Sequence, residues 1–330
     1  MSTSTTVEAA LIDEIRAAES RLAGLALRTP LIRLNAPDNA AEIYLKLENL
    51  QPVGAFKIRS VGNILKSTDP AKLRQGVYTA SSGNSGYALA WLARRLGVSA
   101  TVYVPETAPE GKCASIRRMG AKVRVVPYAD WWDIICNHEV AGEPGLYIDA
   151  VCDPAAIAGN ATIGLEILQD LPAVDTIVVP FGGGGVSCGI ASAVQALKPD
   201  THVFAAECET STALKSAFEA GQPIEVEHQP SFISGIGATS VLPEMWPLLQ
   251  RLLDGSIVSS LEAVTDAIRV LFESNRVVAE AAGATALAAA LSLTANGPVV
   301  CVITGGNIDK AHMIAILQGR VPGATSLKQN

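Results

Sequence analysis

The stretch DTIVVPFGGGGVSCGIASAVQAL, Asp175–Leu197, decides the fold class. Its first six residues, Asp175–Pro180, form a short β-branched run that is typical of a buried strand, and Val186–Leu197 has the Ala-rich composition of a helix. Four consecutive glycines, Gly182–Gly185, separate the two segments. A strand that turns tightly into a helix is half of a βαβ unit, so this stretch predicts an α/β protein built on parallel sheets.

The same alternation recurs along the chain in two series, at about 76–126 and 175–303. The polar, irregular segment Asn137–Pro154 lies between them and is interpreted as an inter-domain connection. We therefore expect two open α/β domains, with ligands bound where strands end and helices begin. Further strands are predicted at Ile43–Leu47, Gly76–Ala80, Ala100–Pro105, Lys122–Val126, His202–Ala206 and Val299–Ile303, and helices at Ser85–Leu96, Pro109–Met119, Thr212–Ala220 and Lys310–Leu317.

Composition excludes several classes of function. The 330-residue chain is 49% hydrophobic and only 17% charged, which suits a compact core rather than disorder. A net charge of −7 argues against nucleic acid or an anionic membrane as partner. The apolar runs are too short to span a bilayer, and the first residues lack a secretory signal, so we expect a cytoplasmic protein. Six cysteines without a CxxC pair fit that reducing compartment, and four histidines argue against an all-protein zinc site.

Three polar or Gly-rich turns follow predicted strands and precede predicted helices: SSGNSG (Ser81–Gly86), FGGGGVS (Phe181–Ser187) and TGGNID (Thr304–Asp309). Four glycines in a row let backbone N–H groups converge on a ligand at a helix start, which favours phosphate binding over a plain tight turn. The GxGxxG spacing of dinucleotide-binding proteins is poorly met here. Glu207, however, lies 22 residues after Gly185, so binding of a nicotinamide cofactor stays a weak alternative.

The turn SSGNSG offers hydroxyls, an amide and backbone N–H groups at a helix start, a combination that suits a carboxylate. Taken alone, the turn is explained better by ordinary helix capping through Ser and Asn. TGGNID is the least specific of the three turns, and alone it is a capped turn.

One lysine, Lys57, stands between Phe56 and Ile58 in LENLQPVGAFKIRS, directly after a Pro/Gly turn. Taken alone, it is more simply a surface residue with apolar neighbours. A buried amine, however, has a lowered pKa and becomes reactive near neutral pH. A phosphate cradle, a carboxylate cradle and such a lysine together match the needs of pyridoxal phosphate and an amino acid substrate.

At this point the sequence resembles a known family. LENLQPVGAFKIRS, TASSGNSGYALA, PFGGGGVSCGI and VITGGNID occur in the order and spacing of the threonine/serine dehydratases, which are pyridoxal-phosphate enzymes of the tryptophan-synthase β-like fold, fold type II, and include serine racemase. The resemblance covers essentially the whole chain. It implies two open twisted-sheet α/β domains, a large one made of residues 1–57 and 151–330 and a small inserted one of residues 58–150.

The resemblance also implies roles for individual residues. Lys57 matches the Schiff-base lysine, and Phe56 the residue beneath the cofactor ring. Asn84 matches the ligand of the cofactor 3′-oxygen, and Thr304 faces the pyridine nitrogen. Gly182, Gly183, Gly184 and Gly185 match the phosphate loop, Ser81, Ser82, Gly83 and Ser85 the loop that grips the substrate carboxylate, and Ser82 also the acid/base of racemases.

The expected activity is β-elimination from a 3-hydroxy amino acid to give a 2-oxo acid and ammonia. Racemisation or β-replacement within the same fold is the runner-up, a nicotinamide-dependent oxidoreductase is a weak alternative, and a non-catalytic ligand-binding relative is weaker still. A homodimer or homotetramer is implied. Because the chain ends at Asn330, no regulatory domain is expected.

This chain also departs from the family pattern. Ala55 replaces a usual serine, Ser85 a histidine and Asn160 a glutamine, and YIDAVCDP (Tyr147–Pro154) replaces a run with His-Pro-Phe. These departures suggest a substrate other than plain threonine or serine. Several relatives bind a cation beside the phosphate loop. Glu207 fits as one ligand, but of the other two expected positions, Ser211 and Ala213, the alanine cannot supply a carboxylate.

Overall fold

The structure is a computed structural model that describes residues 7–35, 42–81, 83–108 and 110–323. Its strands are β1 Leu31–Arg33, β2 Ile43–Lys46, β3 Val77–Ala80, β4 Ala100–Pro105, β5 Lys122–Val126, β6 Leu146–Tyr147, β7 Thr176–Pro180, β8 His202–Cys208, β9 Gly255–Ser259 and β10 Val299–Val302. Its helices are α1 Ile12–Leu22, η1 Glu48–Leu50, α2 Lys57–Ser67, α3 Pro70–Leu73, α4 Asn84–Leu96, α5 Glu110–Arg118, α6 Tyr128–Asn137, α7 Pro154–Asp170, α8 Gly185–Leu197, α9 Ala213–Ala220, α10 Trp246–Leu252, α11 Leu261–Asn275, α12 Ala281–Ala290 and α13 Lys310–Leu317.

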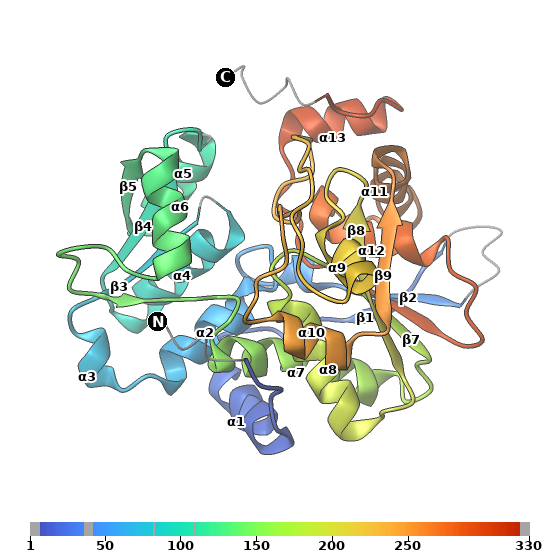
Figure 1. Cartoon of the computed structure of the whole chain (residues 1–330), viewed down its shortest axis with the longest axis horizontal. Coiled ribbons are helices and arrows are strands. Elements are labelled where there is room, and N and C mark those ends of the chain that lie inside the picture. The colour runs from blue at the N-terminus through green and yellow to red at the C-terminus, as the bar shows by residue number, and fades with distance from the viewer. Residues whose placement is uncertain (1–6, 36–41, 82, 109, 324–330) are drawn as a thin grey trace.

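The strands form two sheets, which confirms the α/β class. The larger sheet has the order β1-β2-β10-β7-β8-β9, and all its pairs are parallel except β1 with β2. The smaller sheet is all parallel, with the order β5-β4-β3-β6. Figure 1 shows the smaller sheet with α4, α5 and α6 on one side of the molecule and the larger sheet with its helices on the other. Within the described ranges, none of the helices combines the length and hydrophobicity needed to cross a bilayer.

Most predicted elements coincide with observed ones, but the segment 137–154 does not. It is not a plain connection, because it contains β6, which pairs in parallel with β3 through Val77 to Leu146 and Tyr78 to Tyr147. Two residues of backbone pairing are too short to give a recognisable period in the sequence. All strands of the smaller sheet lie within 77–147; the domain bounds 1–57, 58–150 and 151–330 remain our proposal.

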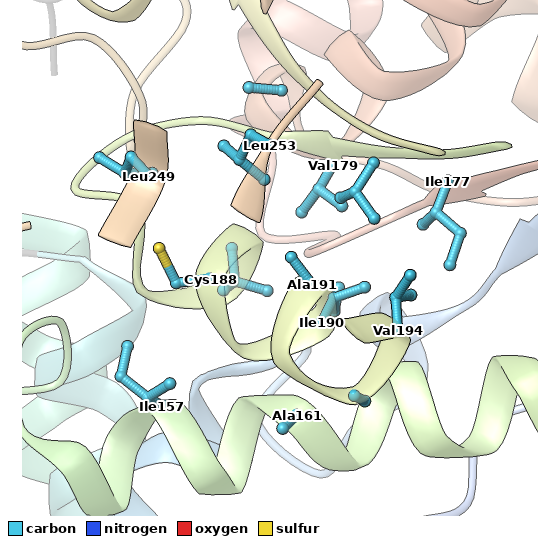
Figure 2. Close-up of a cluster of buried hydrophobic side chains, with 14 of the residues drawn as sticks. Ile157, Ala161, Ile177, Val179, Cys188, Ile190, Ala191, Val194, Leu249 and Leu253 are labelled. Carbon is cyan, nitrogen blue, oxygen red and sulfur yellow. The ribbon is translucent and has the colours of Figure 1, made fainter. Parts of the chain in front are cut away.

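The core of the larger domain fixes the start of α8, the helix that follows the four glycines. Figure 2 shows Cys188, Ile190 and Val194 of α8 lying between α7 and strand β7. Gly189 permits the close approach of the two helices, since a Cβ there would lie 2.7 Å from the Ile157 carbonyl oxygen of α7. The buried helix pair therefore holds the glycine turn in a defined place beside the end of β7.

The sheet order determines which loops meet. Strands β2, β10 and β7 are consecutive neighbours and run parallel, so their carboxyl ends lie along one edge of the larger sheet. The chain after these strands carries Lys57, Thr304 and Gly182–Gly185, respectively. Three of the sequence motifs are therefore brought to the same edge by topology alone.

A buried network of ion pairs lies next to this edge of the larger sheet. Arg59 of α2 pairs with Glu48 at 2.8 Å and with Glu166 of α7 at 2.7 Å, and Lys46 of β2 also pairs with Glu166. All four side chains are at least nine-tenths buried. The network ties β2, η1, α2 and α7 together two residues away from Lys57.

Candidate active site

Lys57 is the first residue of α2 and lies at the sheet edge. Its Nζ donates a hydrogen bond to the carbonyl oxygen of Ala150 at 3.1 Å and lies 4.9 Å from the centroid of the Phe56 ring. Burial lowers the pKa of Lys57 to about 8, against the opposing effect of the Asp149 carboxylate. An amine with this pKa is partly uncharged near neutral pH, as a nucleophilic lysine requires.

The glycine turn forms a cradle at the start of α8. A Cβ on Gly183 would lie 2.7 Å from Val151 Cγ1, and one on Gly185 would lie 2.6 Å from the Val151 carbonyl oxygen, so side chains are excluded there. Gly184 has φ +91°, a left-handed conformation that favours glycine. The first N–H groups of α8 have no helical acceptor, and the buried Ser187 hydroxyl has no partner among the described residues. These donors fit a phosphate group.

One turn of the chain joins the lysine to the cradle. Ala150 accepts the hydrogen bond from Lys57, and the next residue, Val151, packs against Gly183 and Gly185. Asp149 holds this turn by accepting hydrogen bonds from the backbone N–H of Val151 at 2.8 Å and of Cys152 at 3.1 Å. Ala150 and Val151 of the run YIDAVCDP, which departs from the family pattern, therefore lie between Lys57 and the glycine turn and contact both.

The Thr304 turn lies directly beside the lysine segment. The Phe56 N–H donates to the Thr304 carbonyl oxygen at 2.9 Å, and Ala55 forms an antiparallel bridge with Gly305. Both Ala55 and Thr304 are buried. The structure thus brings together the ends of β2 and β10 as their order in the sheet requires.

Asn84, the first residue of α4, connects the smaller domain to the larger one. Its Nδ2 donates to Glu280 Oε1 at 2.7 Å, and its Oδ1 accepts from Asn307 Nδ2 at 2.8 Å. Sequence reasoning missed Glu280, and it included Asn307 only as part of the turn TGGNID, without a role of its own. Glu280 had one visible signal, because it is a single acidic residue directly before the wholly buried, Ala-rich helix α12.

The turn after β3 places Ser81, Gly83 and Ser85 at the start of α4. The Gly83 N–H donates to Ser81 Oγ at 3.2 Å, and the Ser81 N–H donates to the Tyr103 carbonyl oxygen at 3.0 Å, which fixes the turn against β4. Ser82 lies outside the described residues. Carboxylate binding by this turn remains a prediction.

Glu207, named as one ligand of a possible cation, has a structural task at the start of α9. Its carboxylate accepts hydrogen bonds from the backbone N–H groups of Leu214 and Lys215 on α9, each at 2.8 Å, and from Ser256 Oγ at 2.6 Å. No group of three or more His, Cys, Asp or Glu residues in the described part of the chain could hold a metal ion. Glu207 therefore caps α9, and its assignment as a cation ligand stays a prediction.

Comparisons with known proteins agree with this geometry. Residues 22–305 match the family model of pyridoxal-phosphate-dependent enzymes. The chain is 34% identical to an L-threonine ammonia-lyase of Geobacter sulfurreducens, over 95% of this chain and 80% of the relative, and 33% identical to the catabolic L-threonine dehydratase of Escherichia coli, over 92% and 95%.

A solved structure shows the same fold. Serine racemase from maize superimposes with a TM-score of 0.86 at 29% identity, covering 94% of this chain and 98% of the racemase. The chain therefore belongs to the pyridoxal-phosphate-dependent enzymes of fold type II, in the threonine/serine dehydratase family.

Proposed function

We propose that this enzyme eliminates water from a 3-hydroxy amino acid and releases a 2-oxo acid and ammonia. The observation that carries the proposal is the placement of Lys57, a partly buried amine with a pKa of about 8, one turn of chain away from a glycine cradle. Relatives named L-threonine ammonia-lyase and L-threonine dehydratase, at 33–34% identity over nearly the whole chain, support this reaction.

Each residue has a defined task in the proposal. Gly182–Gly185, the first turn of α8 and Ser187 would hold the phosphate of pyridoxal phosphate, while Lys57 would bind its aldehyde. Asn84 and Thr304 would hold the 3′-oxygen and the pyridine nitrogen. When bound, the cofactor supplies an aldehyde for the amino group and a conjugated ring that delocalises negative charge.

Lys57 would then act on the substrate as a base. Once the amino group of the substrate has taken its place on the aldehyde, the freed amine would remove the proton from Cα. The Cβ–O bond would then break, and the hydroxyl would leave with that proton as water. The resulting unsaturated amine takes up water and gives the 2-oxo acid and ammonia. Thr304 carries no charge, so it would not keep the pyridine nitrogen protonated. The bound ring would then delocalise less negative charge, which would favour prompt loss of the β-substituent.

Racemisation is the second candidate function. The similarity to maize serine racemase, a TM-score of 0.86 at 29% identity, favours it. It requires an acid/base on the face opposite Lys57, and Ser82 is the proposed group. Loss of racemisation in Ser82→Ala with elimination from one enantiomer partly retained would support this role, whereas equal loss of both activities would argue against it.

A panel of 3-hydroxy amino acids tests the proposal. The protein, loaded with pyridoxal phosphate, is incubated with L- and D-serine, L- and D-threonine and bulkier analogues, and 2-oxo acid, ammonia and substrate chirality are followed together. We expect equal amounts of 2-oxo acid and ammonia from at least one L-substrate and neither product from Lys57→Ala. Epimerised substrate without 2-oxo acid would contradict the proposed elimination and would support racemisation.

We further propose that the enzyme works in the cytoplasm on free amino acids as a homodimer or homotetramer. The net charge of −7 and the relatives' amino acid substrates support the small-molecule partner. Light scattering after size exclusion measures the assembly, and a mass of 34.3 kDa would contradict an oligomer.

A further inference from the structure

The side-chain amide of Asn84 has a fixed orientation, because its nitrogen meets a hydrogen-bond acceptor and its oxygen meets a donor. Its Nδ2 faces Glu280 Oε1 at 2.7 Å, and its Oδ1 faces Asn307 Nδ2 at 2.8 Å. The Val53 carbonyl oxygen can only accept, so Asn307 turns its Nδ2 toward it and toward Asn84 Oδ1, and the nitrogen of Asn84 is left to face Glu280. Asn307 is oriented in turn, since its Nδ2 also donates to the Val53 carbonyl oxygen at 2.9 Å.

An amide nitrogen carries two N–H groups, and Glu280 takes one of those on Asn84. The other has no acceptor among the described residues and remains for a ligand. If the amide were flipped, its oxygen would meet the carboxylate and no N–H could be presented in that direction. The bond to Glu280 therefore decides whether Asn84 can donate to an oxygen of a bound ligand.

Glu280 is itself held in place by the turn that follows β10. Its backbone N–H donates to the Gly305 carbonyl oxygen at 3.0 Å, and a Cβ on Gly305 would lie 2.2 Å from Glu280 Oε1. Only glycine at position 305 leaves room for this carboxylate. The side chain is buried at the start of α12, and the charged group that acts on it is Lys112 of α5.

We infer that Glu280 is a positioning residue that presents the second N–H of Asn84 to the 3′-oxygen of pyridoxal phosphate. The inference rests on the proposed function, which places the cofactor 3′-oxygen at Asn84. Glu280 lies on the larger domain and Asn84 on the smaller, so the same bond also joins the two domains at the cofactor.

The ionisation of the Glu280 carboxylate provides a measurable test of its position beside Asn84. Burial raises the pKa of Glu280 to about 7, although the hydrogen bond from Asn84 and the charge of Lys112 both oppose this rise. Glu280 therefore gains its charge as the pH rises through about 7. A charge that appears beside Asn84 in this range changes the environment of the cofactor 3′-oxygen.

The test measures cofactor affinity and the visible spectrum rather than turnover. Apo-protein is titrated with pyridoxal phosphate for the wild type, Glu280→Gln, Glu280→Ala and Asn307→Ala, and the visible band of each loaded protein is followed from pH 5.5 to 9. We expect Glu280→Ala to weaken cofactor binding about tenfold, as loss of a hydrogen bond to a charged group does, and Glu280→Gln to weaken it less. The wild-type band should change with a midpoint near pH 7, and this change should be absent in Glu280→Gln.

A double-mutant cycle separates positioning from a purely structural role. If Glu280 acts through Asn84, Glu280→Ala changes the affinity less than about twofold in an Asn84→Ala background. An undiminished effect in that background overturns the inference. Asn307→Ala, which releases the other end of the amide, should behave likewise and replaces Glu280→Ala if that variant does not fold.

Glu143→Gln is the matched control, because this carboxylate also accepts a side-chain hydrogen bond, from Tyr103 Oη at 2.7 Å, but has no bond to Asn84 or Asn307 among the described residues. It should leave cofactor affinity and the spectrum unchanged. If the wild type develops no visible band with the cofactor, the proposed function fails. If the wild type develops the band but shows neither coupling nor the pH-dependent change, only the role of Glu280 fails.

Discussion

At the scale of the residue, Lys57 illustrates how burial prepares a side chain for chemistry. Its pKa falls from the ordinary 10.5 to about 8 because the amine is removed from water, while the Asp149 carboxylate partly restores it. The apolar neighbours Phe56 and Ile58 are visible in the sequence. The carbonyl oxygen of Ala150, which accepts the hydrogen bond from Nζ, cannot be recognised in the sequence, because Ala150 lies 93 residues away along the chain.

The pKa of Lys57 predicts how fast the cofactor binds. Only the uncharged amine reacts with the aldehyde, so the rate constant for loading apo-protein should rise about tenfold per pH unit below pH 8 and level off above it. Stopped-flow absorbance at a series of pH values measures this. A rate that still rises steeply between pH 9 and 10 would show that the amine has its ordinary pKa.

The sign of the stability effect follows from the same shift. The folded protein releases the Lys57 proton near pH 8 and the unfolded chain only near 10.5, so the unfolded chain binds more protons between these values. The contribution of Lys57 to the free energy of unfolding therefore increases from about pH 8 to 10.5. In Lys57→Met this pH-dependent gain should be missing.

At the scale of the element, α2 depends on the buried ion network that holds its first turns. Arg59 lies two residues after Lys57 and pairs with both Glu48 and Glu166. Removing the guanidinium would leave two carboxylates buried without their main partner. Such a loss is much more costly than the loss of a solvent-exposed pair.

We predict that Arg59→Ala lowers the free energy of unfolding by about 3–5 kcal/mol, as measured by urea denaturation. Arg28→Ala is the control, because its partner Asp170 and Arg28 itself are both partly exposed, and it should cost less than about 1 kcal/mol. Equal effects of the two substitutions would show that the network does not stabilise the start of α2.

The glycine turn before α8 gives a second prediction at this scale. Gly185→Ala would place a methyl group 2.6 Å from the backbone oxygen of Val151, which cannot move as a flexible side chain can. We expect at least a tenfold loss of cofactor affinity, measured by titration of the apo-protein, because the cradle must open. Gly111→Ala in α5, where a Cβ meets nothing within 4 Å, should leave affinity unchanged. Unaltered affinity in Gly185→Ala would exclude this turn as the phosphate site.

At the scale of the whole molecule, the sequence was informative where the chemistry is local. Lys57 between apolar neighbours, the four glycines and the strand–turn–helix alternation are patterns of a few residues, and they predicted the α/β fold and three of the loops at the sheet edge. The pairing of Glu280 and Asn307 with Asn84 could not be predicted, because Asn84 lies 196 and 223 residues away in the chain. Only folding shows that such distant polar residues face one another.

The sheet order explains why these distant residues meet. The carboxyl ends of β2, β10 and β7 share one edge, and the smaller sheet contributes α4 with Asn84 to the same place. Lys57 lies at the centre, where it contacts Ala150 beside the glycine cradle, while the adjoining Phe56 contacts the Thr304 turn. Neither domain carries the complete proposed site alone.

Mapping the lysine that carries the cofactor tests this site most directly. The protein loaded with pyridoxal phosphate is reduced with borohydride, digested and analysed by mass spectrometry. We predict one cofactor per chain, attached to Lys57 and absent from Lys57→Ala, with Lys46 and Lys112 unmodified. Attachment to another lysine, or an equal label on Lys57→Ala, would contradict the assignment of the active site.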